Sequence, residues 1–189
     1  MPRLLRIGLV VCAAVCTVGL SACFKKEPVH KTADTEGIYV DAAGVSYQVQ
    51  LSRELNPAAV EDQEYLRGLP PLTSPPNAQE EWFAVWMRAE NLGKKPAQMI
   101  TDFKIDDTQG NVYKPIPLTN ANPVRYLPVR IPAHTTEPIA DSPAFFSPTQ
   151  GELLLFKINV NTYQNRPLTL HLLGPGTLAP SLAEVTLDL

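Results

Sequence analysis

Residues 81–90 read EWFAVWMRAE, an apolar stretch without glycine or proline. Side chains of a β-strand alternate between its two faces, so a strand here would carry two separate rows of side chains. One row contains Phe83, Val85, Met87 and Ala89, and the other contains Trp82, Ala84, Trp86 and Arg88. Because both rows are largely apolar, we predict a central strand that is covered on both faces.

Other segments with a period of two lie on either side of this strand. Residues 152–160 are also apolar on both faces, and they predict a second central strand. Apolar and polar residues alternate in four further segments: 45–52, 101–106, 168–172 and 184–189. Alternation of this kind is typical of antiparallel strands with one face on the core and one in water.

Proline and turn residues separate these segments. The chain has 19 prolines against 10 glycines, and residues 114–150 are especially rich in proline. Proline is disfavoured inside sheets, so this distribution is typical of strands joined by long connections. About seven strands with turns between them predict an all-β, immunoglobulin-like antiparallel β-sandwich.

One short helix is expected in a loop insertion at about 54–79. Asn56 could be its N-cap, Pro57 its first residue and Gly68 its stop, which predicts a helix over 57–67. The insertion has enough apolar residues to fold over the outer row of the central strand. These residues are Val60, Tyr65, Leu66, Leu69 and Leu72.

The N-terminus resembles an export signal. Arg3 and Arg6 precede a short apolar run, and Leu20-Ser21-Ala22-Cys23 follows. The tetrapeptide resembles the bacterial lipobox, in which the cysteine receives a lipid and the peptide is cut just before it. This resemblance implies that Cys23 is acylated and inserts into the lipid bilayer. An uncleaved anchor and a plain secreted protein are the alternatives, and all three place the domain outside the cytoplasm.

The resulting organisation is a signal peptide at 1–22, a flexible tether at 23–36 and one domain at 37–189. Cys12 and Cys16 lie in the predicted leader and Cys23 at its end, so the domain has no cysteine for a disulfide or a thiolate site. The formal net charge is −3, and it becomes more negative when the arginines of the leader are removed. A mildly acidic domain has no electrostatic reason to bind nucleic acid.

Two motifs in the middle of the chain resemble a known family. They are NLGKKP at 91–96 and FKIDDTQGNVY at 103–113. Their pattern is similar to that of the telokin-like, immunoglobulin-like domain of unknown function found on many exported Gram-positive proteins. The resemblance covers roughly residues 38–189, apart from the insertion. It implies a surface or extracellular binding module, and it supplies no known catalytic residues.

Neither catalysis nor metal binding is predicted. The histidines of the mature chain are His30, His134 and His171. No residue pattern here provides a nucleophile elbow or a zinc-binding HExxH helix. We therefore expect no enzyme, no cofactor and no metal.

The turn after residue 105 is the one place where a cation site is worth weighing. Asp106, Asp107 and Asn111 could offer oxygen atoms to calcium. Short carboxylates and amides also bond to their own backbone in turns, and we favour that hairpin interpretation.

Aromatic residues are the candidates for an interaction surface. Trp82 and Trp86 would form an apolar patch if they were exposed, although we expect the insertion to cover them. Phe145 and Phe146 lie in a loop bounded by prolines, and Tyr126 lies in the preceding loop. Loop aromatics can anchor a partner, but they can equally plug the end of a sandwich.

The sequence therefore predicts a non-catalytic envelope lipoprotein on the extracytoplasmic side of the membrane. Its domain would mediate protein interaction or have a structural role, with a partner that is unknown. The alternatives are a carrier or sensor of a small ligand or metal ion, and an accessory subunit of an envelope machine.

Overall fold

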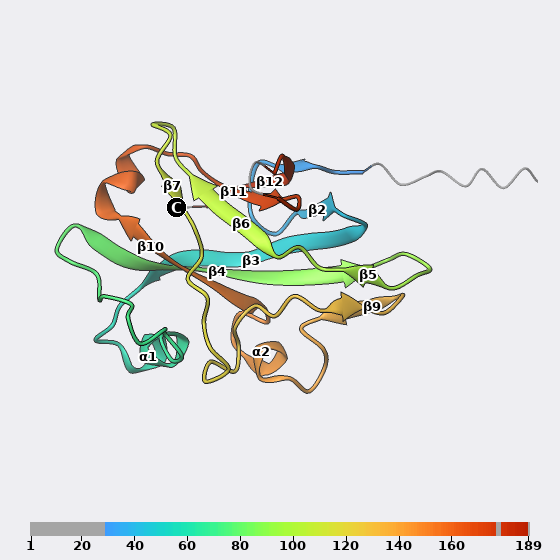
Figure 1. Cartoon of the computed structure of the whole chain (residues 1–189), viewed down its shortest axis with the longest axis horizontal. Coiled ribbons are helices and arrows are strands. Elements are labelled where there is room, and N and C mark those ends of the chain that lie inside the picture. The colour runs from blue at the N-terminus through green and yellow to red at the C-terminus, as the bar shows by residue number, and fades with distance from the viewer. Residues whose placement is uncertain (1–28, 177–178, 189) are drawn as a thin grey trace, which may run out of the picture.

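The protein is described by a computed structural model that covers residues 29–176 and 179–188. The predicted leader, Cys23 and the first part of the tether lie outside these residues. Two β-sheets pack against each other, and two short α-helices lie on the side of the second sheet that faces away from the first (Figure 1). No helix in the described part of the chain is both long and apolar enough to cross a membrane.

The first sheet has the strand order β1-β12-β11-β6-β7. Its strands are β1 (Thr32–Ala33), β12 (Ser181–Leu187), β11 (Leu168–Leu173), β6 (Asp102–Asp106) and β7 (Val112–Tyr113). All pairs are antiparallel except β1 with β12. The predicted strand at 184–189 thus begins three residues earlier, at Ser181, and Leu189 lies outside the described residues.

The second sheet has the strand order β10-β4-β3-β2, all antiparallel. Its strands are β10 (Glu152–Asn159), β4 (Glu80–Asn91), β3 (Val45–Leu55) and β2 (Tyr39–Ala42). A short strand, β9 (Thr135–Glu137), pairs with the last residues of β4, and β5 (Ala97–Gln98) pairs with β8 (Arg130–Ile131) as a separate ribbon. The predicted antiparallel β-sandwich is confirmed, with extra strands of two to four residues at its edges.

The predicted central strand is confirmed as β4. It lies between β3 and β10, and residues 82–87 are buried on both faces. Phe83 and Val85 face the other sheet in the main core, together with residues such as Phe156 of β10. Trp82 and Trp86 lie on the opposite face, where they belong to a second apolar cluster.

This second cluster, which we call the outer cluster, covers the outside of the second sheet. Its buried members are Leu55, Trp82, Ala84, Trp86, Val124, Ala144, Leu153 and Leu155, with Tyr65, Leu66, Leu69, Ile116 and Leu118 packed against them. The insertion thus covers the tryptophans as expected. Val60 and Leu72 do not take part, because they are 77% and 96% exposed. Residues 114–128 and α2 (Pro143–Phe146) supply the rest of the cover.

The predicted helix is present but shorter, as α1 (Val60–Tyr65). It begins later because Asn56 does not cap it: the Asn56 side chain accepts a hydrogen bond from Ala58 N and forms a turn around Pro57. The predicted stop at Gly68 has a left-handed φ of +73°, which glycine adopts without strain. Further helices are α2 and the 3₁₀ helix η1 (Val160–Gln164), neither of which the sequence predicted.

The predicted tether is also shorter than expected. Thr32 and Ala33 pair with β12, and Glu36 accepts hydrogen bonds from Ser52 and from the backbone of Asp188. Pairing at the sheet edge satisfies backbone groups that a flexible segment would leave to water. Residues 32–36 therefore belong to the domain.

Candidate functional site

β10 is the edge strand of the second sheet, and it lies on the same side of the sandwich as β7, the edge strand of the first. Residues 114–128 cross this edge, and three backbone hydrogen bonds attach them to β10. Ile116 N donates to Leu155 O (2.7 Å), Tyr126 N to Leu153 O (2.8 Å) and Leu153 N to Val124 O (2.7 Å). The proline-rich segment is thereby held in place as a partial wall beside the core.

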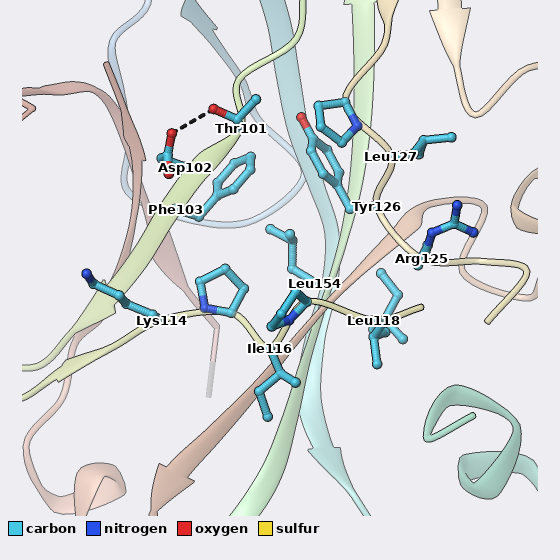
Figure 2. A pocket seen from close by; sticks show the side chains of 14 residues that line it. Thr101, Asp102, Phe103, Lys114, Ile116, Leu118, Arg125, Tyr126, Leu127 and Leu154 are labelled. Carbon is cyan, nitrogen blue, oxygen red and sulfur yellow. Dashed lines mark hydrogen bonds between the residues drawn. The ribbon is translucent and has the colours of Figure 1, made fainter. Parts of the chain in front are cut away.

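A cleft of about 410 Å³ lies between this wall and β6. Figure 2 shows Phe103, Tyr126 and Leu154 on its apolar side, with Ile116 and Leu118 from the crossing segment. Most of its lining residues are apolar, but the surface that it offers is polar and apolar in about equal parts. Its volume lies in the range of binding sites for small molecules. We call it the edge cleft.

Tyr126 forms part of the rigid wall of this cleft. Its hydroxyl donates to Ile100 O (2.9 Å), while the hydroxyl of Tyr47 accepts from Ile100 N (2.7 Å). Its ring meets that of Phe103 edge to face, with 5.1 Å between centroids. Burial raises the pKa of Tyr126 well above its ordinary value, and the pKa of Tyr47 to about 12. Both phenols are therefore neutral and fixed.

The rim of the edge cleft carries charges of both signs. Lys114 and Arg125 lie on opposite sides of the cleft (Figure 2). Among the described residues, Lys114 is exposed and makes no ion pair, and Arg125 donates to Asn122 O (3.3 Å). The one carboxylate in the lining, Asp102, accepts a hydrogen bond from Thr101 (2.6 Å). The rim thus has a small excess of positive charge.

A buried carboxyl group lies behind the cleft wall. Glu152, the first residue of β10, is 9% exposed and accepts a long hydrogen bond from Leu127 N (3.4 Å). Burial raises its pKa to about 8, the backbone hydrogen bond opposes the rise, and nearby Glu137 adds to it. Near neutral pH the Glu152 carboxyl is therefore largely protonated.

The two tryptophans that we considered as an interaction surface are not available for one. Trp82 is 3% exposed and Trp86 is fully buried. Tyr65 packs edge to face on Trp86 at 5.0 Å, and the guanidinium of Arg53 lies 5.3 Å from its ring centroid. They are covered because the insertion, residues 114–128 and α2 all pack on this face.

The other three candidate aromatic residues lie in two different places. Tyr126 lines the edge cleft, whereas Phe145 and Phe146 lie in α2 and do not line it. Phe146 is 70% exposed, and its ring meets that of Phe145 at 5.6 Å. The structure therefore does not bring Tyr126 and the two phenylalanines together in one cavity.

The turn after β6 has the hairpin form that we favoured over a calcium site. The carboxylate of Asp107 accepts from the backbone of Gln109 (3.0 Å) and Asn111 (2.9 Å), and from the side chains of Asn111 (2.8 Å) and Asn165 (3.1 Å). Both carboxylate oxygens are thus occupied by N–H donors. Over residues 29–176 and 179–188, no three acidic, histidine or cysteine side chains are grouped to hold a metal ion.

His171 is more enclosed than its strand position suggested. Its side chain is only 12% exposed, and Asp106 (2.9 Å) and Glu184 (3.2 Å) lie on either side of its ring. Lys104 also pairs with Asp106 at 2.7 Å. Burial alone would raise the pKa of Asp106. The hydrogen bonds from Lys104 and His171 outweigh this effect and lower the pKa below its ordinary value. We interpret this group as a network of hydrogen bonds, with the Lys104–Asp106 ion pair, that links β6, β11 and β12.

Sequence reasoning did not find the edge cleft or Glu152. The cleft depends on a crossing of residues 114–128 over a sheet edge, and such long-range packing leaves no periodic signal. Glu152 is separated from Leu154 and Phe156 by even numbers of residues, so it lies on the same face of the strand. Strand alternation alone would therefore have placed it on the core side. That position was the one available indication of a buried carboxyl group.

The sequence matches no protein-family profile, and no curated protein is significantly similar to it. The structure is similar to that of the yjhA protein from Bacillus subtilis, with a TM-score of 0.50 and 11% identity over 82% of this chain and 99% of that chain. It is also similar to an uncharacterized β-sandwich protein from Clostridium difficile 630, with a TM-score of 0.42 and 9% identity over 86% and 96% of the two chains. At 11% identity, the similarity to the yjhA protein shows the fold alone.

Proposed function

We propose that this chain is an envelope lipoprotein whose β-sandwich binds a partner without catalysing a reaction. Acylation of Cys23 would hold the domain on the extracytoplasmic face of the membrane. The lipobox-like tetrapeptide and the resemblance to the telokin-like, immunoglobulin-like domain support this proposal. The observation that carries the binding role is the edge cleft, with its apolar wall and the two cations, Lys114 and Arg125, on its rim.

The partner that best fits the cleft is an extended peptide segment with apolar and acidic side chains. β7 pairs only with Ile105 and Asp106, so Asp102–Lys104 of β6 have a strand neighbour on the β11 side alone among the described strands. Extended segments bind to such sheet edges through their backbone, while pockets select their side chains. Lys114 and Arg125 would attract the acidic groups.

Site-specific photo-crosslinking in the native envelope tests the binding role. A photoreactive residue at Leu127, which lines the cleft and is 46% exposed, should give a defined protein adduct. The same residue at Leu72, which is 96% exposed and outside the cleft, is the matched control. We expect Lys114→Glu to weaken the adduct at position 127. Identical adduct patterns at both positions would exclude the cleft as the binding site.

The anchor is tested separately with Cys23→Ser. We expect the variant to accumulate as an uncut precursor without a lipid mass on its N-terminus. Normal processing together with unchanged membrane retention would show that Cys23 is not the attachment point.

The second candidate function is a carrier or sensor of a small ligand. It is favoured by the volume of the edge cleft, about 410 Å³, which lies in the usual range for small-molecule sites. Native mass spectrometry of the purified protein distinguishes the two functions. A stoichiometric small-molecule adduct that is lost in Lys114→Glu supports the carrier role over peptide binding.

A further inference from the structure

The described chain begins beside the loop of residues 92–96 that joins β4 to β5, which we call the hairpin for brevity although these two strands are not paired with each other. Val29 lines the same cavity as Leu92 and Gly93 of this hairpin, and the cavity is about 530 Å³. The neighbouring His30 is fixed to β2, because Asp41 N donates to His30 O (2.6 Å) and His30 N donates to the Asp41 carboxylate (3.1 Å). The chain therefore enters the domain at this end (Figure 1).

The distance from this end to the proposed anchor is limited. Seven peptide steps separate Cys23 from His30, and a fully extended chain spans at most about 3.5 Å for each residue. The tether can thus reach no more than about 25 Å. A domain of this size is roughly 40 Å across, as judged from the usual scaling of the radius of gyration. An acylated Cys23 therefore keeps the hairpin end closer to the bilayer than the far end.

The hairpin offers side chains that suit a lipid surface. Leu92 is 55% exposed, and Lys94 and Lys95 are exposed beside it. An apolar side chain can enter the headgroup region, and lysines near the surface are attracted to anionic lipids. Within the part of the chain that the structure describes, neither lysine forms an ion pair.

The hairpin is also held in one conformation by Asn91, which is fully buried. Its side-chain amide donates to Lys95 O (2.9 Å) and Ile131 O (2.9 Å), and its side-chain oxygen accepts from Gly93 N (2.9 Å). These bonds fix the turn to the body of the domain. The side chains at its tip are therefore presented without a large ordering cost on contact.

Most of the exposed charges near this end are lysines. Lys25 and Lys26 follow Cys23 in the sequence, and Lys31 is exposed next to His30. The acidic residues near this end are Glu27 of the tether, the exposed Asp34, and the half-buried Asp41 and Glu90. The carboxylate of Asp41 is already engaged by His30 N and by the hydroxyl of Ser46. Five lysines thus stand against four acids beside the anchor.

We propose that residues 92–95 form a membrane-contact surface that rests on anionic lipid headgroups. The inference depends on the lipid anchor proposed above, and it adds a defined orientation to it. The edge of the sandwich with β7 would then point away from the bilayer, because β7 lies at the opposite end of the domain from the blue start of the ribbon (Figure 1). Contact at the hairpin would hold the domain upright on the membrane.

Depth-dependent fluorescence quenching tests this orientation in the full-length lipidated protein. Leu92→Trp places a reporter at the hairpin, and Val112→Trp places one on β7, where the native residue is exposed to a similar extent (55% and 52%). The native tryptophans contribute a constant background, because both are buried. Each variant is reconstituted into phosphatidylglycerol vesicles that contain a brominated lipid.

We expect the brominated lipid to remove most of the added emission at position 92 and little at position 112. Adding Lys94→Glu and Lys95→Glu should restore the emission at 92, as should vesicles of neutral phosphatidylcholine. Equal quenching at the two positions overturns the inference. Protection of position 92 from iodide without quenching by lipid also overturns it, because a protein would then cover the hairpin. The mass of the N-terminus, measured on the same samples, separately reports whether Cys23 is acylated.

Discussion

Arg53 and Asp62 form a two-point ion pair, with 2.6 Å from Nη2 to Oδ1 and 3.1 Å from Nη1 to Oδ2. The pair links β3 to α1, and the Asp62 side chain is only 8% exposed. The hydrogen bond from Arg53 lowers the pKa of Asp62, against an opposing effect of burial. The insertion is thus attached to the outer face of the sheet by a charge pair as well as by apolar contacts.

We predict that Asp62→Asn lowers the free energy of unfolding at neutral pH by about 2 kcal/mol, the usual value for a hydrogen bond to a charged group. Because the pKa of Asp62 is lowered on folding, its contribution is present above the ordinary value of 3.8 and is lost as pH falls further. Urea denaturation at several pH values checks this. The difference between wild type and Asp62→Asn should shrink below pH 3.8, and a constant difference would contradict the prediction.

Glu152 makes the free energy of unfolding depend on pH in the opposite direction. Its pKa rises from 4.5 to about 8 on folding, mainly through burial, so the folded state holds a proton that the unfolded state releases. The stability present below pH 4.5 is therefore lost progressively as pH rises toward 8, at about 1.4 kcal/mol for each pH unit.

Glu152→Gln should remove this dependence, because an amide keeps the acceptor for Leu127 N and cannot ionise. The variant is expected to be more stable than wild type at pH 8 and nearly equal to it at pH 4.5. Thermal unfolding followed by circular dichroism across this range provides the comparison. Parallel curves for the two proteins would mean that Glu152 is already ionised in the folded state.

The regular strands could be predicted from the sequence, whereas the cover of the sheet could be predicted only in part. Alternation in 81–90 identified β4, because each side chain of a strand must face one of two layers. The helix of the insertion was placed too early, since a local Asx turn at Asn56 competes with helix capping. The cleft escaped prediction because residues 114–128 are fixed by bonds to the distant β10.

Asn122 connects the insertion to residues 114–128, and its loss should separate these two segments. Its side-chain amide donates to Tyr65 O (2.9 Å) and Arg67 O (3.1 Å), and its side-chain oxygen accepts from Val124 N (3.0 Å). Asn122 is fully buried, so alanine would leave several backbone groups without partners. We predict that Asn122→Ala costs about 2 kcal/mol or more.

The exposed Asn120→Ala serves as the control, and it should change stability by less than about 0.5 kcal/mol. Loss of the connection should also expose Trp86, so iodide should quench the tryptophan emission of Asn122→Ala more than that of wild type. An unchanged quenching constant, with stability equal to the control, would show that apolar contacts alone hold the cover.

The last prediction concerns Gly151, which lies directly against the central strand. A Cβ at this position would lie 3.0 Å from Trp86 Cβ and 3.2 Å from both Met87 N and Met87 O. The backbone of β4 is paired on both sides by β3 and β10 and cannot easily move away. We therefore expect Gly151→Ala to lower the free energy of unfolding by about 1–3 kcal/mol, as overpacking usually does.

Gly174→Ala is the matched control, because its new Cβ would meet its nearest atom at 3.6 Å, an ordinary contact distance. Neither glycine has a left-handed φ, so both substitutions differ only in the space around them. Equilibrium urea denaturation of the two variants should show a large loss at 151 and a change below about 0.5 kcal/mol at 174. A similar effect at both sites would mean that the turn before β10 can shift away from β4, and the close packing beneath Trp86 would then not be essential for the fold.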